Sequence, residues 1–123
     1  MVKVDLRLHP EVLFCYSANH NEIIIRVENH HKEAIWVEAD IKVPEMISLS
    51  STTPLGKGRV RIGIIEKNQF LEKAVRIYAN TLTPPQVYKC SVTIYSFNKD
   101  GIIENRMDLT TNIRCERKKD ANY

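Results

Sequence analysis

The sequence predicts an all-β protein, an antiparallel β-sandwich of about seven to nine strands. Apolar and polar residues alternate with a period of two along most of the chain, as expected of strands with one buried face. Turn-forming residues separate these segments roughly every 8–12 residues, and no segment has a convincing helical periodicity. A chain of 123 residues can bury a hydrophobic core without disulfides or a structural metal.

The first predicted strand covers residues 2–8, in which valine and leucine alternate with charged residues. Pro10 interrupts this pattern, and we expect residues 12–16 to continue the same strand beyond a kink. Residues 17–21 are polar and predict a turn that leads into the next strand.

The most regular pattern lies in residues 22–44, which we expect to form a β-hairpin. Alternate positions from Ile23 to Val27 are apolar, and so are alternate positions from Ile35 to Val43. The residues between these two segments are polar throughout, as is typical of a turn. Because Pro44 lacks a backbone N–H, it ends the predicted ladder of hydrogen bonds.

Trp36, the only tryptophan, is out of phase with its apolar neighbours. It shares a strand face with Glu38, Asp40 and Lys42, and burial of all three charged side chains would be very costly. One interpretation is a β-bulge near residue 36, or a neighbouring segment that covers the indole. The other is that Trp36 is exposed and anchors a partner, because aromatic residues are enriched at protein interfaces.

Five further strands complete the expected sandwich. They cover residues 46–49, 60–64, 71–79, 88–94 and 103–115. We expect Val60, Ile62 and Ile64 to share one face of their strand, and Ile103 to share the inward face with Met107 and the alternate residues that follow.

One of these segments has a helical alternative, and one connection between them has a specific turn signal. Residues 67–79 could instead form an amphipathic helix, but both ends of the segment are rich in β-formers, which favours a strand. The sequence from Asn98 to Gly101 predicts a tight turn, because Asp-Gly readily adopts the backbone geometry of hairpin turns.

Several motifs resemble immunoglobulin-like sandwiches, especially the major-sperm-protein type and the NEW3 type of bacteria and archaea. A strand that ends in Val27-Glu28-Asn29 precedes a polar turn and a strand that ends in Pro44. A later Gly63-Ile64-Ile65 leads through a polar turn into another alternating strand. Tyr88 stands two residues before Cys90, the spacing of a tyrosine corner. The resemblance covers residues 8–115 and implies an immunoglobulin-like antiparallel β-sandwich.

The same resemblance bears on the cysteines. In an immunoglobulin domain, the partner of Cys90 lies on the strand before the tryptophan, and residues 23–27 offer only isoleucine, arginine and valine there. Cys15 comes too early in the chain to take that place. We therefore expect Cys90 to be a buried thiol, without an intersheet disulfide.

The composition predicts a cytoplasmic protein with one domain, residues 1–116, and a charged flexible tail, residues 117–123. The first residues carry charge, and no apolar run resembles a signal peptide or a membrane span. Three widely spaced cysteines favour reduced thiols. The abundance of isoleucine, lysine and glutamate, with only four glycines, is typical of a thermophile.

The sequence predicts no enzymatic activity, no cofactor and no metal site. It lacks a Gly-x-Ser-x-Gly elbow, a phosphate-binding glycine loop and a His-Glu-x-x-His motif. His30 and His31 are adjacent in the predicted turn, where their side chains point apart. All histidines lie in the first 31 residues, far in sequence from Cys90 and Cys115, so a cysteine nucleophile is not expected.

We therefore expect a non-catalytic protein–protein interaction module, either an adaptor or a subunit of a larger assembly. The predicted partner-binding residues lie on the outer face of one strand: Trp36, Glu38, Asp40 and Lys42. Binding could also use an edge strand, which would allow a homodimer. The partner is an unidentified protein, and no membrane association is expected.

Two other functions remain open. Weak nucleic-acid binding would use basic and aromatic residues of one outer sheet face and of the C-terminal tail: Lys57, Arg59, Arg61, Arg76, Tyr78, Arg114, Arg117, Lys118 and Lys119. The simpler explanation of these arginines is that they keep an exposed strand soluble and protect an edge. The net charge of +3 is too small for a dedicated nucleic-acid binder. Carbohydrate binding ranks third, because the sequence has no clear row of aromatic residues.

Overall fold

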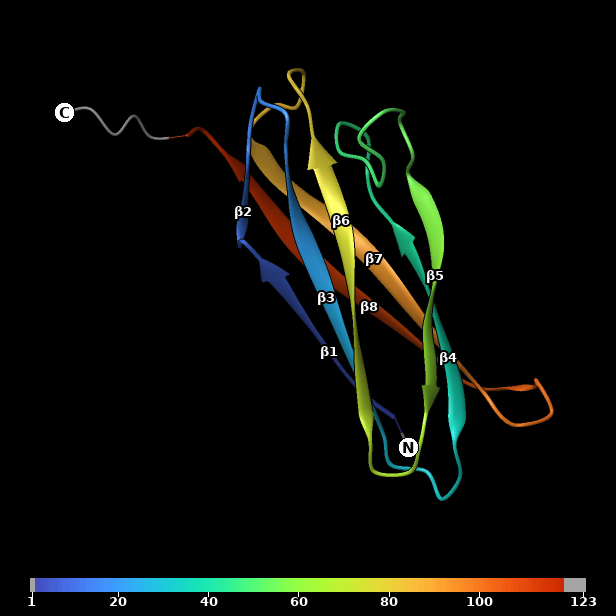
Figure 1. The fold of residues 1–123 in the computed structure, drawn as a ribbon. Helices are drawn as coiled ribbons and strands as arrows, with labels where there is room; N and C mark the ends of the chain where they lie inside the picture. Colours follow the sequence, from blue (N-terminus) through green and yellow to red (C-terminus); the bar gives the residue numbers. More distant parts are fainter. Residues whose placement is uncertain (1, 119–123) are drawn as a thin grey trace.

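The computed structural model describes residues 2–118, and every regular element in that range is a β-strand (Figure 1). The strands are β1 (Val2–His9), β2 (Val12–Phe14), β3 (Asn19–Asn29), β4 (Ile35–Lys42), β5 (Lys57–Ile65), β6 (Phe70–Ala79), β7 (Gln86–Phe97) and β8 (Ile103–Glu116). They form a three-stranded sheet in the order β1-β3-β6 and a five-stranded sheet in the order β2-β8-β7-β4-β5. The prediction of an all-β fold with two sheets is confirmed.

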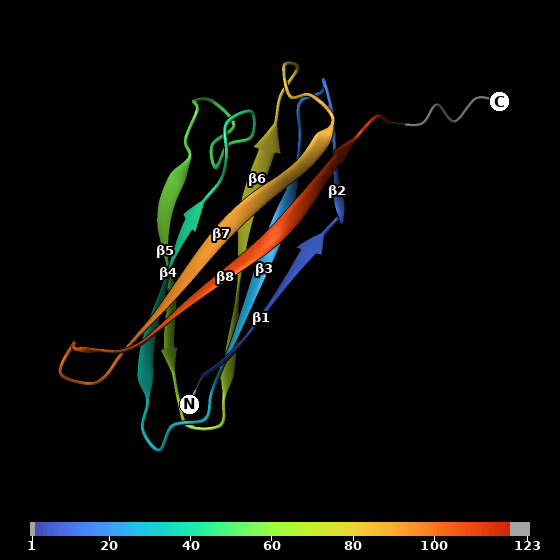
Figure 2. The same cartoon turned by 180° about the vertical axis from the view of Figure 1, so that it is seen from behind.

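The core lies between the two sheets, which are stacked one behind the other (Figures 1 and 2). Alternate residues of both sheets point into it, so one buried cluster joins Ile23, Ile25 and Val27 of β3 with the inward residues of β4 and β7. The inward residues predicted for β7 are all buried: Tyr88, Cys90, Val92 and Ile94. β6 is a strand as predicted, with a buried face from Val75 to Ala79.

The predicted hairpin of residues 22–44 is wrong. β3 pairs with β1 and β6, whereas β4 pairs with β5 and β7 in the other sheet. Asn29 holds the connection between the sheets, because its side-chain N–H groups donate to the carbonyl oxygens of Glu33 and Ile65, both at 2.9 Å. Its side-chain oxygen accepts the His31 N–H at 2.8 Å. The alternation correctly predicted one buried face for each strand, but these faces meet across the core.

Two other sequence expectations also need correction. Residues 12–16 do not continue the first strand, because β1 pairs with β3 and β2 pairs in parallel with β8. The chain changes sheets at His9-Pro10, whose peptide bond is cis. Residues 46–49 do not form a strand, since their only ladder contact is the bridge between Ser48 and Tyr78. Of the predicted tail, residues 119–123 lie outside the described residues.

Candidate functional site

β4 presents the four predicted partner-binding residues on the outer face of the five-stranded sheet. Its burial alternates without interruption, so Ile35, Val37, Ala39 and Ile41 are buried while the residues between them face outward. Trp36 is on this outer face and 37% exposed. The interpretation that a bulge in β4 turns the indole inward is therefore wrong. A role of this face in binding stays a prediction.

A bulge does occur, but on the neighbouring strand β5. Val37 pairs with Gly63, and Glu38 pairs with Arg61, so Ile62 is an extra residue on the β5 side. Gly63 has a φ of 129°, a conformation that glycine adopts far more readily than other residues. The bulge reverses the alternation, so Ile64 is 61% exposed and lies opposite Trp36. The prediction that Ile64 shares a face with Val60 and Ile62 is wrong.

A second bulge has the same effect on β8. Ser96 pairs with Asn105 and Phe97 pairs with Ile103, which leaves Glu104 as the extra residue. Ile103 therefore lies on the outer face and is 54% exposed, although its sequence position predicted an inward side chain.

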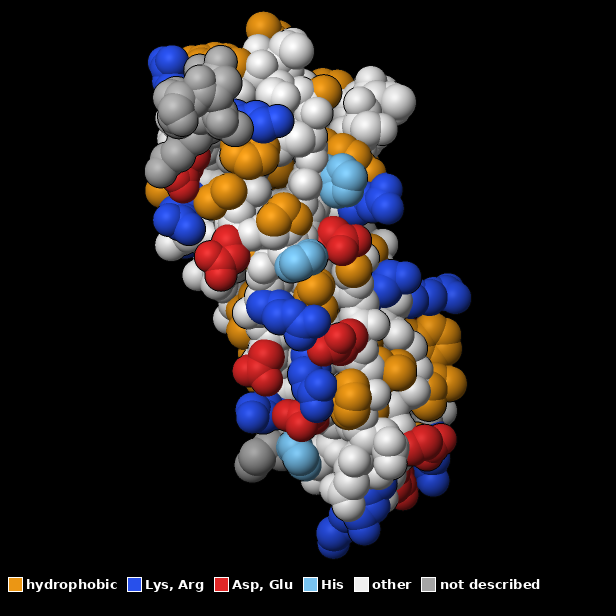
Figure 3. Space-filling view, turned by 60° about the vertical axis from the view of Figure 1, so that its left-hand side comes forward, with side chains coloured by type: hydrophobic (Ala, Val, Ile, Leu, Met, Phe, Trp, Pro, Cys, Tyr) orange, Lys and Arg blue, Asp and Glu red, His pale blue; other side chains and the backbone are white. Residues whose placement is uncertain are grey.

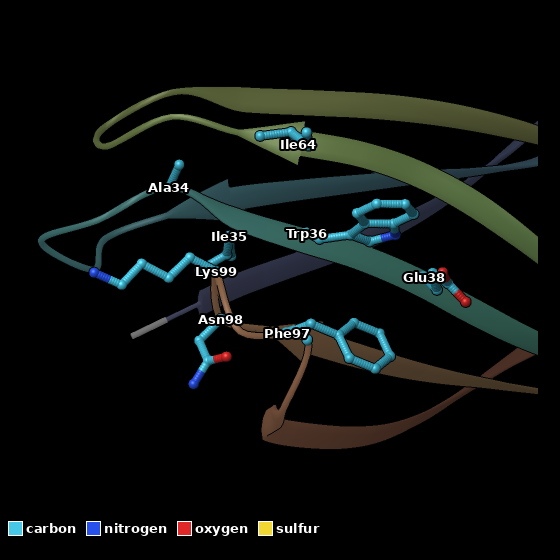
Figure 4. Close-up of a pocket in the computed structure, with 9 residues that line it drawn as sticks. Ala34, Ile35, Trp36, Glu38, Ile64, Phe97, Asn98 and Lys99 are labelled. Atoms are coloured by element: carbon cyan, nitrogen blue, oxygen red, sulfur yellow. The ribbon is translucent and has the colours of Figure 1, made fainter.

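The two bulges complete a row of apolar side chains across four neighbouring strands. This apolar row consists of Ile64, Trp36, Phe97 and Ile103, which are successive register partners on β5, β4, β7 and β8. Figure 4 shows the Trp36 ring between Ile64 on one neighbouring strand and Phe97 on the other. A hollow of about 490 Å³ adjoins these three side chains, and Glu38 and Lys99 also line it.

Charged and polar residues cover the same face next to the apolar row. The nearest row contains Arg61, Glu38, Tyr95 and Arg106, and the following row contains Arg59, Asp40, Thr93 and Asp108. The Arg61 guanidinium lies 5.3 Å from the centre of the Trp36 ring, within the range of a cation–π contact. The apolar row thus borders directly on basic and acidic side chains.

Arg59 and Asp40 form the best-defined ion pair of this face. The Nε and Nη2 groups of Arg59 donate to the two carboxylate oxygens of Asp40 at 2.7 and 3.0 Å. These hydrogen bonds hold the pKa of the Asp40 carboxyl below its usual value. Arg59 Nη1 also lies 3.6 Å from Glu38.

The residues predicted for nucleic-acid binding do not gather on one face. Lys57, Arg59 and Arg61 belong to β5 of the five-stranded sheet, whereas Arg76 and Tyr78 lie on the outer face of β6 in the other sheet. Arg59 binds Asp40, Arg76 lies 4.0 Å from Glu22, and the Tyr78 ring packs on His20. The predicted single basic face is therefore wrong. Lys119, part of the proposed basic tail, lies outside the described residues.

The outer face of the three-stranded sheet carries charges that pair with one another. Lys3 lies 3.8 Å from Glu28, and Arg7 donates to Glu72 at 3.2 Å. Figure 3, which brings the β1 side of the molecule forward, shows basic and acidic side chains interleaved along it. Phe70 also lies on this face, and the Arg26 guanidinium lies 3.6 Å from the centre of its ring. Ion pairs within the sheet thus cover much of the outer face of the three-stranded sheet, whereas the apolar row lies on the outer face of the five-stranded sheet.

The thiols and possible metal ligands of the described residues bear on the chemistry expected from the sequence. Residues 2–118 include no group of three or more His, Cys, Asp or Glu side chains placed to hold a metal ion. Cys15, Cys90 and Cys115 are buried free thiols. Burial raises the pKa of Cys90 to about 12 and that of Cys115 to about 11, so both are protonated at neutral pH. The described residues contain no helix that is long and apolar enough to cross a membrane.

Sequence reasoning found Trp36 and the charged residues of β4, but missed the rest of the apolar row. The one local signal is Gly63, a residue without a side chain within a strand, which often marks a bulge. No signal of this kind marks Glu104. The chain matches no protein-family model and has no significant match among curated proteins.

Proposed function

We propose that the protein is a non-catalytic protein–protein interaction module, and that its partner binds the apolar row of the five-stranded sheet. The observation that carries this proposal is the alignment of four apolar side chains on an outer face. Two bulges expose Ile64 and Ile103 beside Trp36 and Phe97, at a cost in regular sheet pairing. Contiguous exposed apolar surface with a central aromatic residue is typical of binding sites.

The surroundings of the apolar row support the same function. Protein interfaces commonly combine an apolar centre, rich in aromatic residues and arginine, with a polar rim. Here Arg61 and Glu38 lie in the row next to Trp36, and Lys99 also lines the hollow. The bidentate pair of Arg59 and Asp40 restrains the long Arg59 side chain before a partner arrives, which lowers the entropic cost of binding.

The fold supports a place among immunoglobulin-like sandwiches of the major-sperm-protein and NEW3 type. In that assignment the three-stranded sheet contains strands B (β3) and E (β6). The five-stranded sheet contains strands G (β8), F (β7), C (β4) and C′ (β5). The Tyr88 hydroxyl donates to the Pro84 carbonyl oxygen at 2.7 Å, as a tyrosine corner does. Trp36 departs from the immunoglobulin pattern, because the tryptophan of strand C is buried there and half-exposed here.

The function is tested by using the folded protein as bait in a lysate of its source, with and without nuclease. Ile64→Ser and Trp36→Ala remove parts of the apolar row. Leu82→Ser is the matched control, because Leu82 is 76% exposed and lies in the loop after β6. We expect a partner that the wild type and Leu82→Ser retain equally, that Ile64→Ser and Trp36→Ala lose, and that nuclease does not affect.

Two results would contradict the proposal. If Ile64→Ser and Trp36→Ala both retain the partner at the wild-type level, the apolar row is not the binding face. If nuclease removes the bound protein, the chain reaches it through nucleic acid.

A further inference from the structure

One long edge of the five-stranded sheet is open. β2 pairs with β8 only at residues 114–116, so within the described residues no strand pairs with the same side of β8 from Ile103 to Ile113. We call this side the free edge of β8. An unpaired strand edge is a template for the addition of another strand.

The hydrogen-bonding groups at this edge can be assigned from the pairing with β2. The Cys15 N–H donates to the Glu116 carbonyl oxygen at 2.9 Å, so the backbone groups of Glu116 point toward the β2 side. Backbone groups alternate in direction along a strand, and β8 is regular from Asn105 onward. Residues 106, 108, 110 and 112 therefore present their N–H and C=O groups to the free edge.

The core is incompletely covered along this flank. β1 and β8 lie on the same side of the molecule, at the edges of their two sheets (Figure 2). Five apolar residues of these strands point toward the core but are only partly buried: Val4, Leu6, Leu8, Met107 and Leu109. A strand added to the free edge of β8 would cover Met107 and Leu109 with its own inward side chains, which favours its addition.

The outward residues of the free edge are self-complementary. Arg106 and Asp108 are two positions apart and both exposed, and within one chain they lie 3.4 Å apart, so both side chains reach along the free edge and could instead pair with those of a second copy. If two copies of β8 pair antiparallel about a two-fold axis at Met107, each Arg106 lies opposite Asp108 of the second copy. An axis at residue 106 or 108 would instead place two arginines or two aspartates opposite each other, which is destabilising. Residues 106 and 108 both face the edge, so they form hydrogen-bonded pairs in this register.

We propose that the protein forms a homodimer in which β8 pairs with β8 of a second copy about a two-fold axis at Met107, so that the two five-stranded sheets become continuous. The interface is isologous, because a two-fold axis brings the same surface of both copies together. The Met107 side chains of both copies meet on the core side of the joined sheet. The two Met107 residues form a non-hydrogen-bonded pair, the type of antiparallel pair in which opposite residues lie closest. This surface shares only Ile103 of β8 with the apolar row, whose Ile64, Trp36 and Phe97 lie on other strands, so the dimer does not depend on the proposed function.

Charge reversal tests the register. Arg106→Asp places two aspartates opposite each other, and Asp108→Arg places two arginines opposite each other. We expect each variant alone to raise the dimer dissociation constant about tenfold or more in sedimentation velocity, because two like-charge contacts replace two ion pairs. An equimolar mixture of the two variants restores opposite charges at both contacts and should form a heterodimer with the wild-type affinity.

Cross-linking tests the same register without changing charge. Met107→Cys should form a disulfide-linked dimer under mild oxidation, because the two residues face each other at the axis. Leu109→Cys is the matched control, since Leu109 lies opposite Asn105 of the second copy and its two copies are too far apart. The three native cysteines are buried and should not react.

Several outcomes would overturn the proposal. A wild-type protein that sediments as a monomer at all concentrations excludes the dimer. A dimer that both charge variants leave unchanged, or that Leu109→Cys cross-links as well as Met107→Cys, uses a different surface or register. The capture test reads Ile64 on β5 and Trp36 on β4, away from the free edge, so the two proposals fail independently.

Discussion

Ile64 lies directly opposite Trp36 in the β4–β5 ladder, and both side chains are on the outer face of the sheet. Regular alternation along β5 would place Ile64 in the core beside Ile62. The bulge prevents this, because Ile62 and Gly63 together occupy the position opposite Val37 and reverse the phase of the residues that follow. The exposure of Ile64 in the apolar row therefore depends on the backbone conformation of one glycine.

Gly63→Ala tests that dependence. At a φ of 129° a side chain strains the backbone, and the new Cβ would lie 3.0 Å from Leu71 Cδ1. We expect the free energy of unfolding to fall by about 1–3 kcal/mol in urea denaturation. Gly56→Ala is the control, since the nearest atom to its new Cβ is the Val43 carbonyl oxygen at 3.5 Å, and its cost should stay within about 0.5 kcal/mol. If Gly63→Ala lowers the free energy of unfolding by no more than about 0.5 kcal/mol, as expected for Gly56→Ala, the bulge tolerates a side chain.

Ile64 and Ile65 are adjacent, but we expect opposite responses to truncation. Ile64 is 61% exposed, so Ile64→Ala should change the free energy of unfolding by no more than about 0.5 kcal/mol. Ile65 is 1% exposed, so Ile65→Ala should cost about 2–5 kcal/mol, since it leaves a cavity in the core. Chemical denaturation of both variants measures the difference. The reverse order would mean that β5 has no bulge and that Ile64 is a core residue.

Tyr88→Phe removes the hydroxyl that donates to the Pro84 carbonyl oxygen at 2.7 Å. The ring stays in the core, where Tyr88 is 1% exposed, but the carbonyl loses its hydrogen bond. We expect a loss of about 1–2 kcal/mol in the free energy of unfolding. Tyr16→Phe, at a position 53% exposed, should leave thermal and chemical stability nearly unchanged. A neutral Tyr88→Phe would show that this hydrogen bond contributes nothing net to folding.

The Arg59–Asp40 pair predicts a dependence on pH. Its hydrogen bonds lower the Asp40 pKa from the ordinary value of 3.8, so the folded state binds this proton less tightly than the unfolded state does. The stabilisation is therefore present above about pH 4 and is lost as the pH falls through the folded-state pKa. A carbon-13 NMR titration of the Asp40 carboxyl should show this low pKa in the wild type.

The matching variant is Arg59→Gln, which removes the positive charge and both hydrogen bonds from Asp40. We expect the Asp40 pKa to rise toward 3.8 in this variant. Arg59→Lys should give an intermediate value, since it keeps the charge without the bidentate geometry. Identical titration curves for wild type and Arg59→Gln would mean that the pair is not formed in solution.

The limits of sequence reasoning are clearest at the connection between β3 and β4. Alternation in residues 22–44 identified the buried face of each strand, because a period of two depends only on local burial. It carries no information about which strand lies alongside, and a short polar connection suits a hairpin as well as a crossing between sheets. The crossing is fixed by Asn29, whose side chain reaches the carbonyl of Ile65, a residue distant in sequence.

The candidate site shows the same division. Trp36, Glu38 and Asp40 could be placed on one face from the sequence, because β4 is regular. Ile64 and Ile103 could not, since each lies beyond a bulge that reverses the phase. The division of the basic residues between two sheets likewise depends on strand pairing, which periodicity along one strand does not reveal.

The order of the rows gives the outer face a direction along its strands. The apolar row lies at one end, paired arginine and carboxylate side chains occupy the middle, and Lys42 and Lys57 lie opposite each other beyond them. A partner docked in the reverse orientation would place its apolar side chains on the two lysines and its charged side chains on Trp36. These charged groups would lose hydration without gaining an ion pair or a hydrogen bond. For the binding proposed at the apolar row, this order of rows favours one orientation of the partner along the strands.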